Sequence, residues 1–443
     1  MRRTWFITVF VFALVAAACT GGDDGGGGGD GGGDGANGAD GGPVELILWH
    51  GFGTAQGEPD AEWQSLLDRV DEFNTSHPDI HVTSIRCCTN DKALEKVTVA
   101  LQGDEAPDIT YQYGSSLAQL AAAPGLVDLT EWTQRPEVVW DDFILGATAA
   151  AEYEGKVLGV PALIDNLAVV YNVDMFEAAG LEPPSPDWTW DDFRAAAAAL
   201  TDPATQTFGL AFPADASEDT VWHFDPMLWQ AGGSILSEDG TQAAFNSEAG
   251  VRALETLRAM AVDDGSMYLD LQNAKITDLF NSGNAGMIIT GPWDLSGLTD
   301  VPYGVQVLPG FDGDHQTIAG PDMWCVFDHG ETRREAALEF LTWYTAAEQI
   351  QTDSLASGHL PLRTSVIEEP GFTDELEASF PGVGAFAANL ANVQQARPTT
   401  ATYPQISVAM GEAVVAALLG EKTSQQALDD AAAEVNDILA LPA

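Results

Sequence analysis

The sequence predicts an α/β fold arranged in two lobes. Strand-like apolar runs alternate with segments whose apolar residues recur at helical spacing, and this alternation is typical of a largely parallel sheet flanked by helices. About 400 residues follow a Gly-rich N-terminal segment, which is more than one hydrophobic core usually holds. No regular repeat and no long linker follow Gly42, so we expect the two lobes to be intertwined rather than strung in a line.

The first expected lobe starts with three strand-like runs separated by two amphipathic segments. In order, these are a strand at 44–50, a helix at 60–73, a strand at 80–85, a helix at 91–101 and a strand at 107–111. Ligands of open α/β sheets bind beyond the carboxyl ends of the strands. The segments 50–53 and 111–115, at the ends of the first and third strands, are therefore candidates for a ligand site.

Local signals mark the ends of several later elements. Gly180 is expected to end a short helix at 174–179, and Thr189 is expected to cap a helix that continues to Leu200. Apolar runs predict strands at 157–161, 167–171 and 285–290. Helical spacing predicts helices at 247–262, 331–350, 407–419 and 424–439.

The N-terminal segment has the pattern of a secretory signal. Two arginines precede an apolar run at 5–15, which is shorter than the roughly 20 residues of a membrane span. Three alanines then precede Cys19, a pattern that resembles the lipobox of bacterial lipoproteins, where the cysteine carries a lipid. We expect a signal peptide at 1–18, then a lipidated Cys19 and a flexible Gly/Asp-rich tether at 19–43. An ordinary signal peptide with a chance cysteine is the alternative.

The charge balance restricts the partners. The chain carries 67 Asp and Glu against 17 Lys and Arg, a formal net charge of −50. Nucleic-acid binding needs a basic surface, so we expect no nucleic-acid partner. Few cations are available to hold an anionic ligand, which favours a neutral one. Self-repulsion also favours a monomer.

Three cysteines remain after Cys19. A disulfide is permitted outside the cell, and the odd number leaves one thiol unpaired. Either Cys87 or Cys88 could pair with Cys325, or the two neighbours could form a strained bridge. Their spacing matches no redox or zinc motif.

Catalytic motifs are missing from the sequence. It has no G-x-S-x-G nucleophile elbow, no HExxH, no P-loop and no EF-hand loop. His77 and His81 are four residues apart, but Pro78 and the strand-like run after it keep them off a helix face, so we expect no metal there. Carboxylates are so abundant that a glycosidase-type pair stays open, although no pair stands out. We expect no enzyme activity, no metal and no cofactor.

Short motifs recur in a specific order along the chain, at 49–50, 73–78, 106–109, 153–161, 170–180, 189–193, 229–233, 286–293 and 358–361. In this order they resemble extracellular solute-binding proteins of ABC importers, the carbohydrate-binding family 1. The resemblance covers nearly the whole chain from Val44 to Leu441. The adjacent Cys87 and Cys88 depart from the family pattern.

The resemblance implies a type II periplasmic-binding-protein-like fold with a ligand cleft between two α/β lobes. The implied lobes are 44–160 plus 307–357 and 161–306 plus 358–443. Members of this family deliver a solute to a membrane permease and leave it chemically unchanged. Lobe closure over the ligand would be the signal that the permease detects.

The strongest expected ligand contacts follow from the shape of a sugar. A sugar offers an apolar face to an aromatic ring and an edge of hydroxyls to polar side chains. Trp293 ends a strand after Gly-Pro, where similar proteins place a stacking aromatic, although a core tryptophan is the alternative. Asp165 and Asn166 lie in the probable hinge crossing, where similar proteins carry a ligand-binding polar residue; a solvated loop is the alternative.

The other expected contacts are His50, Tyr113, Trp222, Trp229, Gly320, Trp324, Arg397 and Tyr403. A purely structural role is an equal alternative for His50 and Trp324. Of Trp222 and Trp229, one is expected at the ligand and one in the core. Tyr113 is preferred over Tyr111 because it lies nearer its strand end. Arg397 could equally be a surface ion-pair partner.

The leading hypothesis is a lipid-anchored binding protein for a neutral sugar or oligosaccharide. The second is a binding protein for a glycerophosphodiester or a similar metabolite, for which Arg397 would be the anchor. The third is a secreted carbohydrate-active enzyme.

Overall fold

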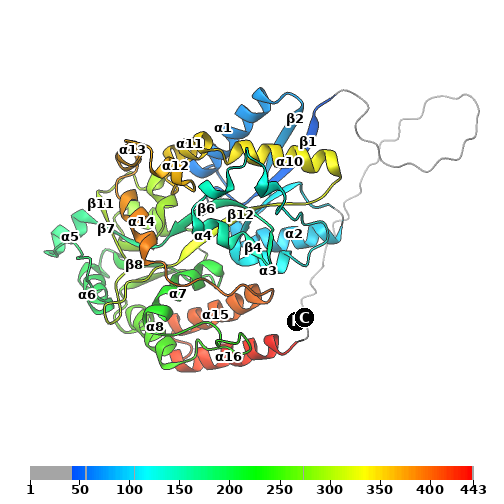
Figure 1. Cartoon of the computed structure of the whole chain (residues 1–443). Coiled ribbons are helices and arrows are strands. Elements are labelled where there is room, and N and C mark those ends of the chain that lie inside the picture. Colours follow the sequence, from blue (N-terminus) through cyan, green and yellow to red (C-terminus); the bar gives the residue numbers. More distant parts are fainter. Residues whose placement is uncertain (1–41, 55–56, 104, 273, 442–443) are drawn as a thin grey trace, which may run out of the picture. The chain divides into compact units, whose positions relative to one another are not determined.

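The computed structural model describes residues 42–54, 57–103, 105–272 and 274–441 (Figure 1). The expected signal peptide at 1–18, the lipidation at Cys19 and the tether up to Gly41 lie outside these residues. Among the helices that are described, none combines the length and the hydropathy that a membrane crossing requires.

A five-stranded sheet forms the first lobe. Its strands, in spatial order, are β2 (Ile80–Arg86), β1 (Val44–His50), β3 (Ile109–Tyr113), β12 (Ala319–Val326) and β6 (Val160–Asn166). β1 pairs in parallel with β2 and β3, whereas β12 pairs antiparallel with β3 and β6. Because β6 carries the chain out of this lobe and β12 brings it back, the two crossing strands run in opposite directions side by side.

A second five-stranded sheet forms the second lobe. Its order is β11 (Tyr303–Gln306), β7 (Ala168–Asn172), β10 (Ala285–Thr290), β8 (Phe208–Pro213) and β9 (Met267–Asp270). β7 pairs antiparallel with β10 and β11, whereas β8 pairs in parallel with β10 and β9. A two-stranded hairpin consists of β4 (Glu152–Tyr153) and β5 (Lys156–Val157).

Helices cover both sheets. Those that pack in the first lobe include α1 (Ala61–Ser76), α2 (Ala93–Gln102), α3 (Leu117–Leu120), α4 (Leu145–Ala150), α10 (Glu331–Tyr344) and α11 (Ala347–Ser357). Those of the second lobe include α5 (Val173–Ala179), α6 (Trp190–Leu200), α7 (Glu218–Gln230), α8 (Glu248–Arg258), α9 (Ile276–Asn281), α15 (Tyr403–Leu418) and α16 (Ser424–Leu439). Three short helices, α12 (Thr364–Ile367), α13 (Phe372–Ser379) and α14 (Val383–Asn389), lie between α11 and α15 in the chain. The α/β class with helix-flanked sheets is confirmed, although the strand directions are more mixed than the sequence indicates.

Several helix boundaries follow from caps that the sequence predicts. The Thr189 side chain accepts a hydrogen bond from the backbone N–H of Asp192, and the Asp192 side chain accepts from the backbone of Thr189 in return. Gly180 ends α5 in the left-handed region at φ +70°, which a residue without Cβ adopts at low cost. The helix expected at 331–350 is two helices, because the backbone leaves the helical conformation around Thr345.

Three apolar cores hold the lobes together. One lies in the first lobe, between its sheet and helices such as α1 and α10, and one lies in the second lobe around α7, α8, α15 and α16. The third joins side chains of β6, β7 and β10 to the segment 360–386. The lobe boundary expected after residue 160 stays a prediction, but β6, which begins there, pairs within the first sheet.

The structure shows none of the disulfides that the sequence leaves open for Cys87, Cys88 and Cys325. Cys325 is fully buried on β12, whereas Cys87 and Cys88 directly follow β2. Because β1 and β3 lie between β2 and β12 in the sheet, neither of the two neighbours is bonded to Cys325, and all three thiols are free. The Sγ atoms of Cys87 and Cys88 lie 2.6 Å apart in a hydrogen-bonding contact.

Candidate functional site

Two tryptophans of the second lobe pack together against a crossing strand. Trp222, on the first half of α7, lies over Trp293 with ring centroids 5.5 Å apart and an interplanar angle of 31°. A Cβ added to Gly320 of β12 would lie 3.1 Å from Cζ2 of Trp222. The missing side chain at this position therefore admits the indole close to the strand. Three of the expected ligand contacts are thus brought together.

The position of Trp293 depends on the residue two places before it. Gly291 is extended, with φ −111° and ψ −177°, and Pro292 then starts the short helix η6 (Pro292–Gly297). A Cβ at Gly291 would lie 1.9 Å from Cζ3 of Trp293. The Trp293 indole thus folds over the bare backbone of Gly291, and it stays partly exposed.

We expect Gly291→Ala to displace the Trp293 ring from its position against Trp222 with little loss of stability. The extended backbone accepts alanine, but the Trp293 ring must swing away from the new methyl group. Ligand affinity, measured by isothermal titration calorimetry, should fall at least about tenfold, which is about 1.4 kcal/mol. Gly297→Ala in the same helix is the control, because its Cβ would meet only Thr277 at 3.7 Å. Equal affinities for the two variants would contradict this role of Gly291.

An acidic group of the first lobe lies within electrostatic range of the start of α7 in the second lobe. The Tyr113 hydroxyl at the end of β3 donates to Asp91 Oδ1 at 3.2 Å, and Asp91 belongs to the short helix η1 (Asn90–Lys92). Burial raises the pKa of Asp91 to about 7, with further contributions from the carboxylates of Asp219 and Asp215. Asp219 lies in the first turn of α7, so acidic side chains of the two lobes lie within electrostatic range of each other.

A second carboxyl group lies on the crossing strand itself. Asp322 stands opposite Tyr113 on β12, and its Oδ2 accepts a hydrogen bond from the Tyr111 hydroxyl. Its other oxygen, Oδ1, is buried without a hydrogen-bond partner. Burial raises the pKa of Asp322 to about 7, although the Tyr111 hydrogen bond and the Arg397 charge lower it in part.

Arg397 is engaged inside the second lobe. Its guanidinium lies 2.7 Å from Glu218 Oε1, and the Tyr403 hydroxyl donates to the same oxygen at 3.1 Å. The Ser407 hydroxyl donates to the other oxygen of Glu218. Both Arg397 and Tyr403 are therefore brought to the start of α7, but as partners of a buried carboxylate.

Asp165 and Asn166, the two polar residues expected to bind ligand at the hinge crossing, are buried and form hydrogen bonds with residues of the segment 359–389. Asp165 on β6 accepts from His359 Nδ1 and from the Leu360 backbone N–H at 3.1 Å. The side-chain amide of Asn166 donates to Phe386 O at 2.8 Å and accepts from Asn389 at 2.8 Å. His359 also lies 3.2 Å from Glu62 of α1, so its imidazole lies between the carboxylates of Asp165 on β6 and Glu62 on α1.

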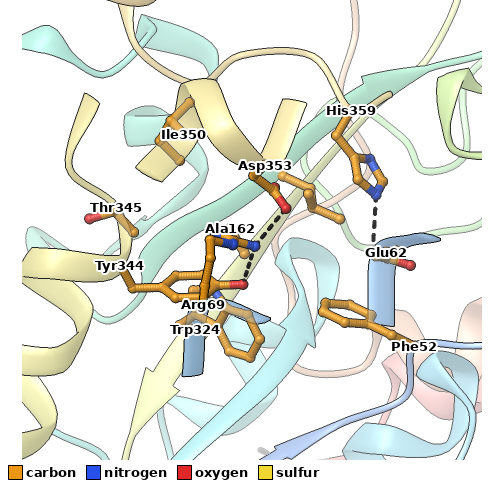
Figure 2. Close-up of a pocket in the computed structure, with 11 residues that line it drawn as sticks. Phe52, Glu62, Arg69, Ala162, Trp324, Tyr344, Thr345, Ile350, Asp353 and His359 are labelled. Carbon is orange, nitrogen blue, oxygen red and sulfur yellow. Dashed lines mark hydrogen bonds and ion pairs between the residues drawn. The ribbon is translucent and has the colours of Figure 1, made fainter. Parts of the chain in front are cut away.

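Figure 2 shows His359 and Glu62 at one side of a small cavity. At the other side Arg69 donates to the Tyr344 hydroxyl and lies 2.6 Å from Asp353. The cavity has a volume of about 10 Å³, which is room for no more than one water molecule. It is therefore part of the hinge packing and too small for a sugar.

Three other expected contacts are buried inside the lobes. Trp324 is 1% exposed and packs edge-to-face on Tyr111, and Trp229 is 3% exposed in the core of the second lobe. His50 is 1% exposed, and its Nδ1 accepts from the Phe52 backbone N–H at 3.2 Å. Burial, with a smaller effect of Arg86, lowers the pKa of His50 to about 4, so the ring is neutral. We do not include these three among the proposed ligand contacts.

A wider pocket of about 390 Å³ lies in the first lobe. Its charged walls are held by the ion pairs Arg135–Glu335, at 2.9 Å, and Arg334–Asp328, at 3.0 Å. Its aromatic lining residue, Trp132, is 2% exposed and offers no open face. This pocket therefore lacks the stacking surface that a sugar needs.

Sequence reasoning missed several groups at the junction of the lobes. Asp91, Asp219, Asp322, Glu218 and His359 belong to it, yet in the sequence each is one acidic or imidazole residue among many. One weak signal existed, because Asp322 alternates with Gly320 and Trp324 on the same strand. Among the described residues, no three His, Cys, Asp or Glu side chains are arranged to hold a metal ion.

Comparisons with known proteins agree with this architecture. A family model described as bacterial extracellular solute-binding protein matches residues 68–379. A curated relative, the sn-glycerol-3-phosphate-binding periplasmic protein UgpB of Yersinia enterocolitica, is 25% identical over 414 residues, which cover 88% of this chain and 90% of the relative.

Two solved structures are also similar. The cyclic alpha-maltosyl-1,6-maltose binding protein from Arthrobacter globiformis is 28% identical with a TM-score of 0.72, over 90% of this chain and 99% of that chain. The ABC substrate-binding protein Lmo0181 from Listeria monocytogenes, in complex with cycloalternan, is 25% identical with a TM-score of 0.79, over 90% of this chain and 100% of that chain.

Proposed function

Because this chain belongs to the family of bacterial extracellular solute-binding proteins, we propose that it captures a sugar or oligosaccharide outside the cytoplasm and delivers it unaltered to an ABC importer permease. The observation that carries the choice of ligand is the Trp222–Trp293 pair beside Gly320. A partly exposed indole at the crossing strands offers the flat apolar surface on which the C–H face of a sugar stacks. The similar Arthrobacter protein is named for binding a cyclic maltosyl-maltose, and the similar Listeria protein is in complex with cycloalternan, which supports a carbohydrate ligand here.

Polar groups near the aromatic pair fit the hydroxyl edge of a sugar. The indole Nε1 of Trp222 is a buried donor without a partner, and Asp322 Oδ1 is a buried acceptor without one. A hydroxyl both donates and accepts, so a polyhydroxylated ligand can pair with both groups. Tyr113 and Asp91 add further hydroxyl and carboxyl partners at the same junction.

A phosphate-bearing ligand is the second candidate, because the Yersinia relative is named for sn-glycerol-3-phosphate binding. The charges at the lobe junction disfavour a phosphate-bearing ligand in this chain. Arg397, the expected anchor, is neutralised by Glu218, and the surrounding acidic groups would repel an added phosphate. We therefore keep a glycerophosphodiester as the alternative.

The cellular setting of this proposal follows from the N-terminal sequence pattern. A lipid on Cys19 and the Gly/Asp-rich tether would hold a monomer at the outer face of the membrane, where it meets the permease. Lobe closure would be the bound state that the permease recognises, since a ligand shifts the equilibrium only through contacts that differ between the open and closed states. The lobes proposed for this motion are 44–160 plus 307–357 and 161–306 plus 358–443.

The relatives are binding proteins, and we propose that this chain also performs no chemistry on its ligand. Incubation of the purified protein with a bound sugar should leave the sugar intact after many binding cycles. Product accumulation in excess of the protein would instead favour the carbohydrate-active enzyme.

A thermal-shift screen followed by calorimetry tests the ligand class. Neutral mono- and oligosaccharides, aminated sugars, glycerol 3-phosphate and glycerophosphocholine form the panel, since a ligand that binds only the native state raises the melting temperature. We expect carbohydrates to give the largest shifts. Trp293→Ala should then lower the affinity at least about tenfold, about 1.4 kcal/mol.

Trp343→Ala is the matched control, because Trp343 is also partly exposed but packs on Phe73 of the first lobe. Its affinity for the same sugar should stay close to the wild-type value. A shift with the phosphate compounds alone would overturn the carbohydrate proposal.

A further inference from the structure

Acidic side chains from several elements converge on the aromatic pair. Asp219 of α7 lies within electrostatic range of Asp91 and Tyr113 in the first lobe and of Asp294 in the second. Asp294 directly follows Trp293, and Asp219 is one helical turn before Trp222. The stacking surface is thus bordered by carboxyl groups on both lobes.

Burial of Asp322 and partial burial of Asp91 and Asp294 distinguish these carboxyl groups from the many acids of the surface. Asp91, Asp294 and Asp322 each have a raised pKa, with burial as the main cause. A general excess of acidic residues on the surface costs little, because water solvates it. A buried carboxylate is expensive unless a cation or hydrogen-bond donors compensate it.

The cations of the chain leave this group uncompensated. Arg397 pairs with Glu218 at 2.7 Å, and His223 pairs with Asp219 at 3.3 Å. Within the described residues, Asp91, Asp294 and Asp322 form no ion pair. Hydroxyl groups donate to all three, and the backbone N–H of Gly114 also lowers the pKa of Asp322. Carboxyl groups therefore outnumber cations at the junction.

Unpartnered atoms mark the place where a ligand group would fit. Trp222 is 9% exposed and Asp322 is 8% exposed, and the indole Nε1 and the carboxyl Oδ1 both lack a partner. Trp222 lies against Gly320, two residues before Asp322, so both residues border the same face of β12. A ligand that stacks on the indoles thus comes next to an unpaired carboxyl oxygen.

We propose that the captured carbohydrate carries a positively charged amine, held between the carboxyl groups of Asp91 and Asp322 and the aromatic rings of Tyr113 and Trp222. This inference rests on the proposed function, since it names the chemical class of sugar that the same junction takes. An ammonium group is a donor of three hydrogen bonds and a unit charge. It satisfies Asp322 Oδ1, offsets the excess negative charge and gains cation–π attraction from the rings.

Other ligand classes fit this environment less well. A neutral sugar pairs with the hydroxyl and indole groups but leaves the buried negative charge uncompensated. A phosphate adds to that charge. A metal ion needs three or more ligating side chains arranged around one point, which the described residues do not provide.

Matched sugars test the inference. Cellobiose, N,N′-diacetylchitobiose and the amine-bearing β-1,4-linked glucosamine disaccharide share one linkage and differ only at the 2-position of each ring. Glucose, N-acetylglucosamine and glucosamine form the corresponding monosaccharide set. In whichever of the two sets binds, calorimetry should show that the amine-bearing sugar binds at least about tenfold more tightly than its neutral analogues. This corresponds to about 1.4 kcal/mol.

Removal of one carboxyl charge should change the affinity for the amine but not the affinity for the neutral analogues. Asp91→Asn keeps the shape of the side chain and the Tyr113 contact. It should lower the affinity for the amine about tenfold and leave the affinity for the neutral sugar nearly unchanged. Asp79→Asn, an exposed residue outside the junction, is the charge-matched control. Asp322→Asn is the second variant, and the melting temperature of each variant without ligand reports whether it folds.

As the pH falls from about 8 to about 6, the wild-type protein should lose more of its affinity for the amine than Asp91→Asn does, because Asp91 takes up a proton near pH 7 whereas protonation of the ligand amine affects both proteins alike. The groups that face Asp91 are Tyr113, Asp215, Glu218 and Asp219, and those that face Asp322 are Tyr111, Asp165 and Arg397. A preference for the neutral sugars over the amines would overturn this inference and leave the proposed function intact. Absence of binding by every sugar of the panel would overturn both.

Discussion

We expect His359→Gln to destabilise the fold by about 3 kcal/mol, because it leaves two buried carboxylates without their common partner. The imidazole lies between Asp165 of β6 and Glu62 of α1, and both His359 and Asp165 are nearly inaccessible. Removal of one member of a buried ion pair costs much more than the pair itself contributes, since the remaining charge stays desolvated. Urea unfolding at neutral pH, followed by tryptophan fluorescence, measures the change.

The size of this effect should depend on pH. Burial alone would lower the pKa of His359, but Asp165 and Glu62 outweigh it and raise the pKa well above the ordinary value of 6.5. A raised folded-state pKa means that the charged imidazole stabilises the fold fully below about pH 6.5 and that this stability is lost as the pH rises through the folded-state pKa. The difference between wild type and His359→Gln should therefore be largest near pH 6 and shrink in alkaline solution.

Two further variants separate the buried network from a general loss of charge. Glu62→Gln combined with His359→Gln should be less destabilised than His359→Gln alone, because one orphaned carboxylate is removed. Arg252→Gln breaks an exposed ion pair with Asp312 and should change stability by less than about 1 kcal/mol. A His359→Gln effect as small as that of Arg252→Gln would contradict the role assigned to the imidazole.

Arg397→Met is expected to cost about 3 kcal/mol of stability without abolishing carbohydrate binding. The guanidinium compensates Glu218, which also accepts hydrogen bonds from Tyr403 and Ser407 inside the second lobe. Loss of the cation leaves the Glu218 carboxylate, which is 14% exposed, with hydroxyl donors alone. Chemical unfolding gives the stability, and calorimetry gives the affinity of the folded fraction.

The paired variant Arg397→Met with Glu218→Gln should recover part of the lost stability, since it removes both charges together. The affinity measurement decides between ligand classes. If Arg397 anchors a phosphodiester, binding disappears in both variants. If it is a structural partner of Glu218, an aminated sugar binds at least as well as before, because one positive charge near the ligand is gone.

Much of the fold was predictable because it depends on local chemistry. The strand at 44–50, the cap at Thr189 and the glycine end of α5 follow from short-range preferences, and the structure confirms them. Strands β8, β9 and β12 and the helix α7 were missed. α7 contains Pro226, which a helix interior normally excludes, and nearly every residue on it is buried, so no amphipathic pattern marks it.

The site was predictable only in part. The partly exposed Trp293 and its neighbours Trp222 and Gly320 do lie together, because a Gly-Pro-Trp strand end and a small residue on a crossing strand leave a trace in the sequence. The partners of Asp165, Asn166 and Arg397 are between 179 and 223 residues away in the chain. No local pattern indicates contacts at that separation.

The sequence by itself determined the class of fold, the likeness to solute-binding proteins and the excess of negative charge, since each depends on composition or on short-range order. Only the tertiary structure decided which acidic residues are buried beside the tryptophans and which are solvated on the surface. The physical reason is that the pKa and the energetic cost of a carboxyl group depend on the water and charges around it, and folding sets those surroundings by joining segments that are remote in the chain.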